Sequence, residues 1–153
     1  MASIASIQLT SGPNIQANLL EVSKYLEEIS KGKSKLVVLP ENFAFMPEND
    51  VSFLTNAEVE GSGPIQEFIA ENAAKYKIWI IAGTIPLKTK NPNKVTSSTL
   101  VFDDKGQIVA RYDKIHLFDV QLPNSDESYN ESEVFEHGKN IKIIETPVGI
   151  VGL

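Results

Sequence analysis

The apolar positions at the start of the chain follow two different spacings. Over residues 3–10 apolar residues alternate with small or polar ones, which is typical of a strand. After a candidate helix cap at Asn14, apolar residues recur every three or four positions and share one helical face: Ile15, Leu19, Val22, Leu26 and Ile29. The continuous apolar run 35–39 is typical of a parallel strand that is covered on both faces. The pattern predicts a strand, a helix and a second, parallel strand.

The middle of the chain predicts a second helix and an antiparallel hairpin. Pro64 stands near the first helical position of an amphipathic stretch, and residues 78–85 form an apolar strand pattern. Residues 95–102 and 107–113 flank a turn that ends with Gly106, and such a turn favours a β-hairpin. Because parallel and antiparallel strands then belong to one sheet, we expect a mixed sheet.

The last part of the chain begins with a long acidic segment, residues 117–138, that has no periodicity and predicts a loop. A strand is predicted over residues 140–145, followed by a turn and by a second apolar strand over residues 150–153. Domains normally end in a polar tail or a docked helix, so an apolar strand at the last residues is unusual. We expect one domain or part of one.

Composition excludes several classes of protein. The 153 residues are 42% hydrophobic and 22% charged, close to the average of globular domains. The net charge of −6, without a basic stripe, argues against a nucleic-acid partner because few cations face phosphates. No apolar run approaches the ~20 residues of a membrane helix. The first residues lack the basic region of a signal peptide, so we expect a cytoplasmic location and no membrane partner.

The sequence contains no cysteine and two histidines. The absence of cysteine excludes disulfides, thiolate metal sites and a cysteine nucleophile within these residues. His116 and His137 are isolated from clustered carboxylates, which makes a poor metal site. We expect His116 to be a packed or hydrogen-bonded structural residue and His137 to be exposed. No metal or cofactor is predicted.

Two residues stand where a sheet places its chemistry. Glu41 follows the apolar strand 35–39 and Pro40, at the carboxyl end where open α/β sheets bind ligands. Lys114 ends a row of side chains that shares one face of the predicted hairpin strand by its period of two. A solvated loop glutamate and a surface lysine are the alternatives that these patterns leave open.

Three segments, taken in order and at their separations, resemble the nitrilase superfamily of carbon–nitrogen hydrolases, and within it the Nit-type amidases. They are LPENF at 39–43, RYDKIHLFD at 111–119 and TPVGIVGL at 146–153. The resemblance implies an α/β fold of the nitrilase-like αββα sandwich type, of which this chain is the N-terminal half with a mixed sheet. A flavodoxin-like domain would explain the first strands but not the hairpin that ends at the lysine.

The resemblance also implies roles for individual residues. Glu41 matches the general base of the family's Glu-Lys-Cys triad, and Lys114 matches its lysine. Glu131 resembles a second glutamate that lies near the lysine in several branches. Phe43 and Tyr112 flank the two main candidates and are predicted to line the substrate pocket, with core packing as the alternative.

The nucleophilic cysteine of the family would follow a few residues beyond Leu153. The expectation is therefore one incomplete carbon–nitrogen hydrolase domain over residues 1–153, inactive by itself. The complete enzyme would hydrolyse a small amide without a cofactor, and it would be a homo-oligomer or require a complementary C-terminal half. The alternative hypothesis is a non-catalytic binding or scaffold module that pairs with such a half or with itself.

Overall fold

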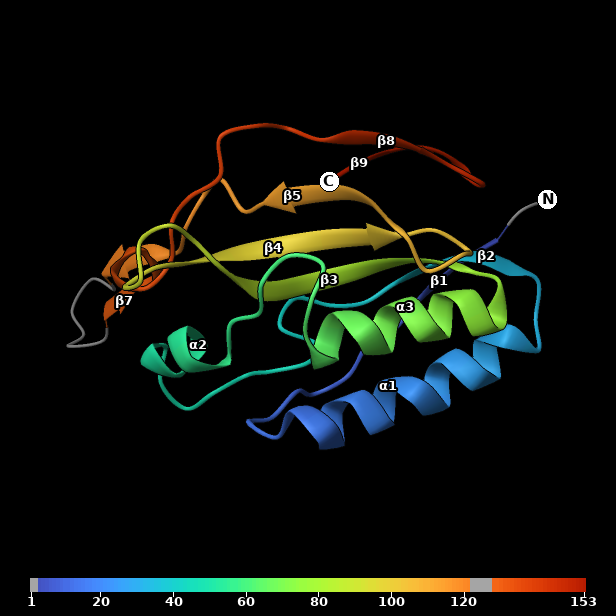
Figure 1. The fold of residues 1–153 in the computed structure, drawn as a ribbon, viewed down its shortest axis with the longest axis horizontal. Helices are drawn as coiled ribbons and strands as arrows, with labels where there is room; N and C mark the ends of the chain where they lie inside the picture. Colours follow the sequence, from blue (N-terminus) through green and yellow to red (C-terminus); the bar gives the residue numbers. More distant parts are fainter. Residues whose placement is uncertain (1–2, 122–127) are drawn as a thin grey trace.

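The computed structural model describes residues 3–121 and 128–153, and these form three layers (Figure 1). Two long helices make the first layer, a five-stranded sheet the second and a separate two-stranded hairpin the third. The helices are α1 (Ile15–Ser30) and α3 (Pro64–Tyr76), and the hairpin strands are β8 (Ile143–Thr146) and β9 (Gly149–Gly152). The sheet contains β1 (Ser3–Ser6), β2 (Ser34–Val38), β3 (Trp79–Lys88), β4 (Val95–Phe102) and β5 (Ile108–Asp113).

The sheet is mixed, as predicted. Its strands follow the chain order from β1 to β5, with β2 parallel to both β1 and β3. The other two pairings, β3 with β4 and β4 with β5, are antiparallel. The carboxyl end of β2 pairs with Ile81, while β3 continues to Lys88, so the chain leaves β2 beside the middle of β3. The carboxyl end of a parallel strand is where open α/β sheets leave room for a site.

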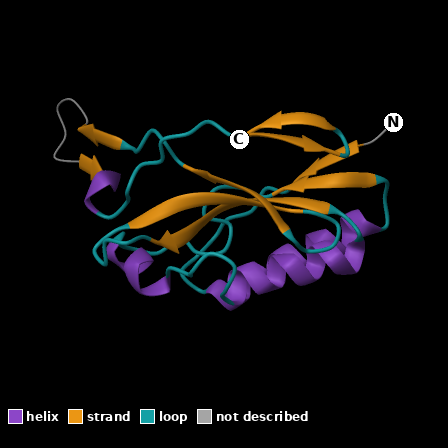
Figure 2. Cartoon of the chain, turned by 45° about the horizontal axis from the view of Figure 1, so that its top comes forward, coloured by secondary structure: helices purple, strands orange, loops and turns teal. Residues whose placement is uncertain are grey.

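Both long helices cover the same face of the sheet (Figure 2). The side chain of Asn14 accepts a hydrogen bond from the backbone N–H of Ala17 at 3.0 Å, which confirms the predicted cap of α1. Val22 and Leu26 on the predicted apolar stripe are fully buried. In the part of the chain that the structure describes, no helix is both long and apolar enough to span a membrane.

The start of α3 is held by a buried carboxylate rather than by its own cap residue. Glu58, 7% exposed, accepts hydrogen bonds from the backbone N–H groups of Ile65 at 2.7 Å and Gln66 at 3.2 Å. A carboxylate at a helix N-terminus satisfies free donors and interacts favourably with the helix dipole. This contact fixes the segment before α3 against the end of the helix.

The hairpin of β8 and β9 packs against the face of the sheet that the helices leave open. A separate apolar cluster joins Leu36, Ile81 and Val101 of the sheet to Ile144 and Val151 of the hairpin. The arrangement of helices, sheet and second sheet agrees with the α/β layers that the resemblance implies.

The prediction of a loop over residues 117–138 was wrong in part. The segment contains β6 (Asp119–Gln121) paired with β7 (Ser128–Asn130), followed by the 3₁₀ turn η1 (Glu131–Glu133). Strands of three residues are too short to show a periodicity, so the sequence pattern does not reveal them. Residues 122–127, which also belong to the predicted loop, lie outside the described residues.

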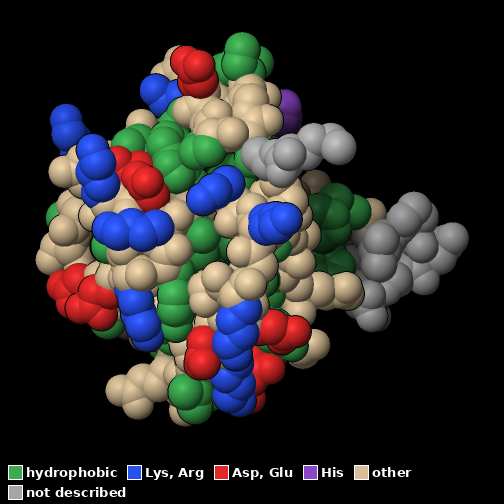
Figure 3. Space-filling view, turned by 90° about the vertical axis from the view of Figure 1, so that its right-hand side faces the viewer, with side chains coloured by type: hydrophobic (Ala, Val, Ile, Leu, Met, Phe, Trp, Pro, Cys, Tyr) green, Lys and Arg blue, Asp and Glu red, His purple; other side chains and the backbone are tan. Residues whose placement is uncertain are grey.

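The face in Figure 3 shows one end of the molecule, with the N-terminal strand and the far ends of both long helices. Lys and Arg side chains on this face are interspersed with acidic and polar ones. This view shows no continuous basic stripe, in agreement with the net charge of −6.

Two leucines of α1 provide a matched test of the helix–sheet packing. Leu26 is 0% exposed and Leu20 is 61% exposed. We expect Leu26→Ala to lower the free energy of unfolding by about 2–5 kcal/mol, because it leaves a cavity between helix and sheet. Leu20→Ala should change it by less than about 0.5 kcal/mol. Urea unfolding followed by circular dichroism measures both, and equal losses would contradict this packing.

Candidate active site

Glu41 is placed by a close approach between the end of β2 and the middle of β3. Gly83 of β3 lies so near Pro40 that an added Cβ atom would stand 1.8 Å from the Pro40 carbonyl oxygen. Only glycine therefore allows the two segments to meet here. Gly83 was not among the residues predicted for the site, although a glycine inside an apolar strand pattern indicates a close approach of the backbone.

Lys114 is fixed by backbone contacts on both of its sides. Its N–H donates to the carbonyl oxygen of Ser97 at 2.9 Å, and its own carbonyl oxygen accepts from the N–H of Gly138 at 2.8 Å. A Cβ atom on Gly138 would lie 2.1 Å from the carbonyl oxygen of Asp113, so a second glycine permits this packing. No local pattern in the sequence indicates this role of Gly138.

The structure brings Glu41, Lys114 and Glu131 together. The Lys114 Nζ atom lies 3.0 Å from Glu41 Oε1 and also 3.0 Å from an oxygen of Glu131. The other role of Glu131 is to accept, through Oε2, a hydrogen bond from the N–H of Phe118 at 2.6 Å. Glu131 is the least exposed of the three side chains at 17%, against 26% for Lys114 and 56% for Glu41.

The two carboxylates determine the charge state of the lysine. Burial lowers the pKa of Lys114, but hydrogen bonds to Glu131 and Glu41 and the negative charges of both groups outweigh burial. The net effect raises the pKa of Lys114 above its ordinary value of 10.5. Lys114 is therefore an ammonium group at neutral pH, able to donate hydrogen bonds but not to act as a base.

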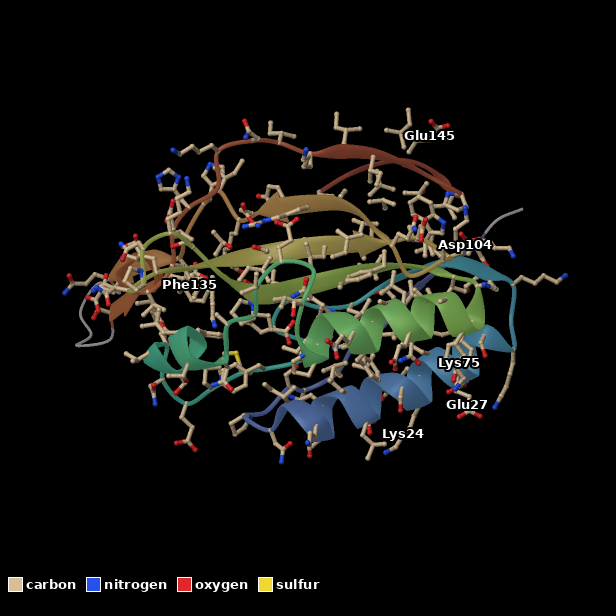
Figure 4. The ribbon with its side chains drawn as sticks, viewed as in Figure 1. Lys24, Glu27, Lys75, Asp104, Phe135 and Glu145 are labelled. Carbon is tan, nitrogen blue, oxygen red and sulfur yellow. The ribbon has the colours of Figure 1, made fainter. Side chains whose placement is uncertain are left out.

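A cavity of about 300 Å³ opens beside this cluster. Its lining combines the three charged side chains with Asp50, two asparagines, a methionine and four aromatic rings. These lining residues are Glu41, Asn42, Met46, Asp50, Phe53, Lys114, Phe118, Tyr129, Asn130, Glu131 and Phe135. Figure 4 shows Phe135 at the end of the molecule that holds α2 (Val51–Asn56) and β7. The cavity thus has apolar walls and one charged corner.

A second cavity, of about 410 Å³, lies on the other side of Glu41. The ends of β2 and β9 line it together with the middle of β3 and one residue of β4. The lining residues are Val38, Leu39, Glu41, Ile81, Gly83, Thr84, Thr99, Val151, Gly152 and Leu153. Because Glu41 borders both cavities, its carboxylate stands between the charged cluster and the end of β9.

Phe43 and Tyr112 lie away from these cavities. Phe43 is fully buried in the core between helices and sheet, so its placement favours the core-packing alternative. The hydroxyl of Tyr112 accepts a hydrogen bond from the N–H of Ile115 at 3.3 Å, and its ring lines a different cavity with Lys139. Tyr112 therefore supports the turn that follows Lys114.

The two histidines are both exposed. This confirms the prediction for His137, whereas His116 is at the surface rather than packed, because it follows the point where the chain leaves the sheet. Within residues 3–121 and 128–153, no group of three or more His, Asp or Glu side chains is arranged to hold a metal ion.

Comparison with known proteins gives a single family. Residues 3–153 match a family model described as carbon-nitrogen hydrolase. A deaminated glutathione amidase from Yersinia enterocolitica is 37% identical over 99% of this chain and 53% of its own length. The omega-amidase NIT3 from Saccharomyces cerevisiae is 34% identical over 98% of this chain and 53% of its own length. The chain spans about half the length of these relatives.

Solved structures give the same result. The NitFhit protein of C. elegans superposes with a TM-score of 0.84 and 28% identity, over 97% of this chain and 37% of that chain. Nit3 from Saccharomyces cerevisiae, a member of branch 10 of the nitrilase superfamily, superposes with a TM-score of 0.80 and 29% identity, over 97% and 53%. The fold of this chain is therefore similar to about half of those chains or less.

The contacts in the charged cluster predict how Lys114 titrates. NMR titration of its side chain should give a pKa above 10.5 in the folded chain. Glu41→Gln and Glu131→Gln should each lower this pKa, because each removes a negative charge and a charge-assisted hydrogen bond from Lys114. An unchanged pKa in either variant would contradict the corresponding contact.

The same shift fixes the sign of a pH effect on stability. The pKa of Lys114 is raised on folding, so its contribution to stability is fully present below the unfolded-state pKa of about 10.4. The contribution is lost as the pH rises through the higher folded-state value.

Proposed function

The chain belongs to the carbon–nitrogen hydrolase family, and on this basis we propose that it supplies the Glu41, Lys114 and Glu131 part of an amidase active site. The nucleophile of that site would be a cysteine from sequence outside these 153 residues, which contain none. The observation that carries the proposal is the contact of the Lys114 Nζ atom with both carboxylates at 3.0 Å. Glu41 precedes Lys114 by 73 positions and Glu131 follows it by 17, yet both carboxylates contact the same ammonium group.

In this proposal Glu41 acts as the general base. A thiol with a pKa of about 8.5 is mostly protonated at neutral pH, so a carboxylate must take its proton as the sulfur attacks the amide carbon. Glu41 suits this role because it is the more exposed carboxylate and borders the second cavity. Glu41 then returns this proton to the leaving nitrogen, so that ammonia departs and a thioester remains. The same carboxylate takes a proton from water as the water attacks the thioester and passes it to the departing sulfur, which releases the acid and restores the thiol.

Lys114 stabilises the transition state in this mechanism. The tetrahedral intermediate carries a negative oxygen, and a preorganised donor aimed at such an oxygen contributes about 10²–10³ in rate. The raised pKa of Lys114 keeps the group an ammonium throughout the reaction. Glu131 accepts a hydrogen bond from the Phe118 N–H, which fixes its carboxylate. It thereby holds the Lys114 ammonium in place and is itself unchanged by the reaction.

The end of β9 supports the position proposed for the missing nucleophile. Leu153 and Glu41 line the same cavity. Strand backbone advances about 3.3 Å per residue, so a residue a few positions beyond Leu153 comes within range of the carboxylate. Residues 1–153 would then be one part of a single hydrolase domain.

The relatives support a small amide as the substrate class. The names deaminated glutathione amidase and omega-amidase both describe enzymes that cleave amides. The apolar walls of the first cavity can receive the carbon chain of such a substrate next to Lys114. The proposed mechanism uses side chains only and needs no cofactor.

Activity measurements on a protein that contains these residues together with the proposed nucleophile segment, here called the full-length protein, test these roles. We expect Glu41→Gln and Lys114→Ala each to lower kcat for release of ammonia from small primary amides by at least about 10²-fold. Lys24→Ala is a matched control, since Lys24 pairs with Glu21 on the exposed side of α1, away from the cavity (Figure 4). The 153-residue chain alone should release no ammonia. Turnover by that chain, or unchanged kcat in either variant, would refute the proposal.

A second candidate function rests on the outer face of the hairpin. Ile141, Ile143 and Ile150 are 78%, 69% and 79% exposed there. Clustered exposed apolar side chains mark surfaces that bind a partner. On this alternative the chain is a non-catalytic module that pairs with a complementary half or with itself.

Light scattering coupled to size exclusion tests self-pairing. The alternative predicts a dimer of the 153-residue chain that Ile143→Asp and Ile150→Asp each convert to monomer, because an added charge opposes burial of the patch. Leu20→Asp, on the exposed face of α1, is the control. A monomer at all concentrations would count against self-pairing.

A further inference from the structure

Strand β3 departs from regular pairing next to Glu41. Its register with β4 shifts between Ala82 and Ile85, and the residues between them are Gly83 and Thr84. Such irregularities turn side chains away from their regular direction. Here the backbone of Gly83 and the side chain of Thr84 both face the segment that carries Glu41.

Thr84 contacts the residue that follows Glu41. The N–H of Asn42 donates to Thr84 Oγ1 at 2.8 Å, and Thr84 Oγ1 donates in turn to Asn42 Oδ1 at 3.2 Å. Asn42 has a φ of 52°, in the left-handed region that asparagine tolerates better than most residues. The hydroxyl therefore satisfies the backbone donor of a residue in an uncommon conformation.

Gly83 contacts the residue that precedes Glu41. Its surroundings leave no room for a Cβ atom beside the Pro40 carbonyl oxygen. Consecutive residues of β3 thus hold the backbone on both sides of Glu41, whose own side chain is 56% exposed. The contact with Lys114 holds the far end of this half-exposed side chain, and the backbone on both sides of Glu41 fixes where the side chain starts.

We infer that Thr84 is a positioning residue for Glu41, acting through the backbone of Asn42. The inference rests on the proposed role of Glu41 as general base. Without the hydroxyl, the Asn42 N–H loses its partner and the turn after Pro40 can relax. Relaxation there moves the Glu41 carboxylate relative to the Lys114 ammonium.

The first test uses the 153-residue chain and does not depend on activity. Thr84→Val keeps the shape of the side chain and removes the hydroxyl, whereas Thr84→Ser keeps the hydroxyl. We expect Thr84→Val to shift the NMR-measured pKa of Lys114 downward, toward its value in Glu41→Gln, because a displaced carboxylate raises that pKa less. Thr84→Ser should keep the wild-type value, as should the control Thr55→Val at the exposed end of α2.

The second test uses the full-length protein and small primary amides. Misplacement of a catalytic group by an ångström costs up to about 10²-fold, so Thr84→Val should lower kcat by about 10- to 100-fold. KM should stay within about twofold, because the lost interaction acts in the transition state. Thr84→Ser should recover kcat to within about threefold of wild type. The acid limb of the kcat/KM profile should also move in Thr84→Val, which a general loss of stability would not cause.

The outcomes separate this inference from the proposed function. A folded Thr84→Val chain with wild-type Lys114 titration overturns the positioning role, whatever the activity. A shifted titration with full turnover in Glu41→Gln upholds the positioning geometry and refutes Glu41 as base. If Thr84→Val does not fold, Thr84→Ala replaces it, and equal kcat in Thr84→Ala and Thr84→Ser overturns the inference.

Discussion

The ammonium group of Lys114 is the point on which the arrangement of the candidate site depends. It contacts carboxylates from two segments, the turn after β2 and the turn η1, and its own backbone directly follows β5. One partly buried cation thus ties three parts of the chain together. The cation keeps its charge because both partners are acidic, and removal of either partner takes away one hydrogen bond and one negative charge that raise the pKa of Lys114.

The layered packing explains why the charged cluster lies at the carboxyl ends of β2 and β5. Helices cover one face of the sheet and the β8–β9 hairpin covers the other, so side chains in the middle of the inner strands are apolar and buried. Polar groups find water or partners only where the strands end. Two glycines, Gly83 and Gly138, then let backbone segments approach closely enough for the charged side chains to meet.

Much of this architecture could be predicted from local pattern. The apolar stripe of α1, the cap at Asn14 and the hairpin of β4 and β5 follow spacings that a single segment contains. The sequence pattern did not reveal β6 and β7, because each strand has only three residues. The exposure of His116 was not predicted either. Phe43, two residues after Glu41, was a candidate for the pocket, but the chain turns at Asn42, whose φ is 52°, and Phe43 lies in the core.

Local patterns along the chain define the order of the two long helices and of the strands β1 to β5, and the three short segments that carry the family resemblance are properties of the sequence alone, as is the absence of a cysteine within these residues. These properties depend on residue type and on spacing along the chain. The tertiary structure alone decided that Lys114 meets Glu131 as well as Glu41, that Gly83 adjoins Pro40 and that Thr84 binds Asn42. Such contacts join residues between 17 and 73 positions apart. Their distances are set by how the layers pack, which no local periodicity encodes.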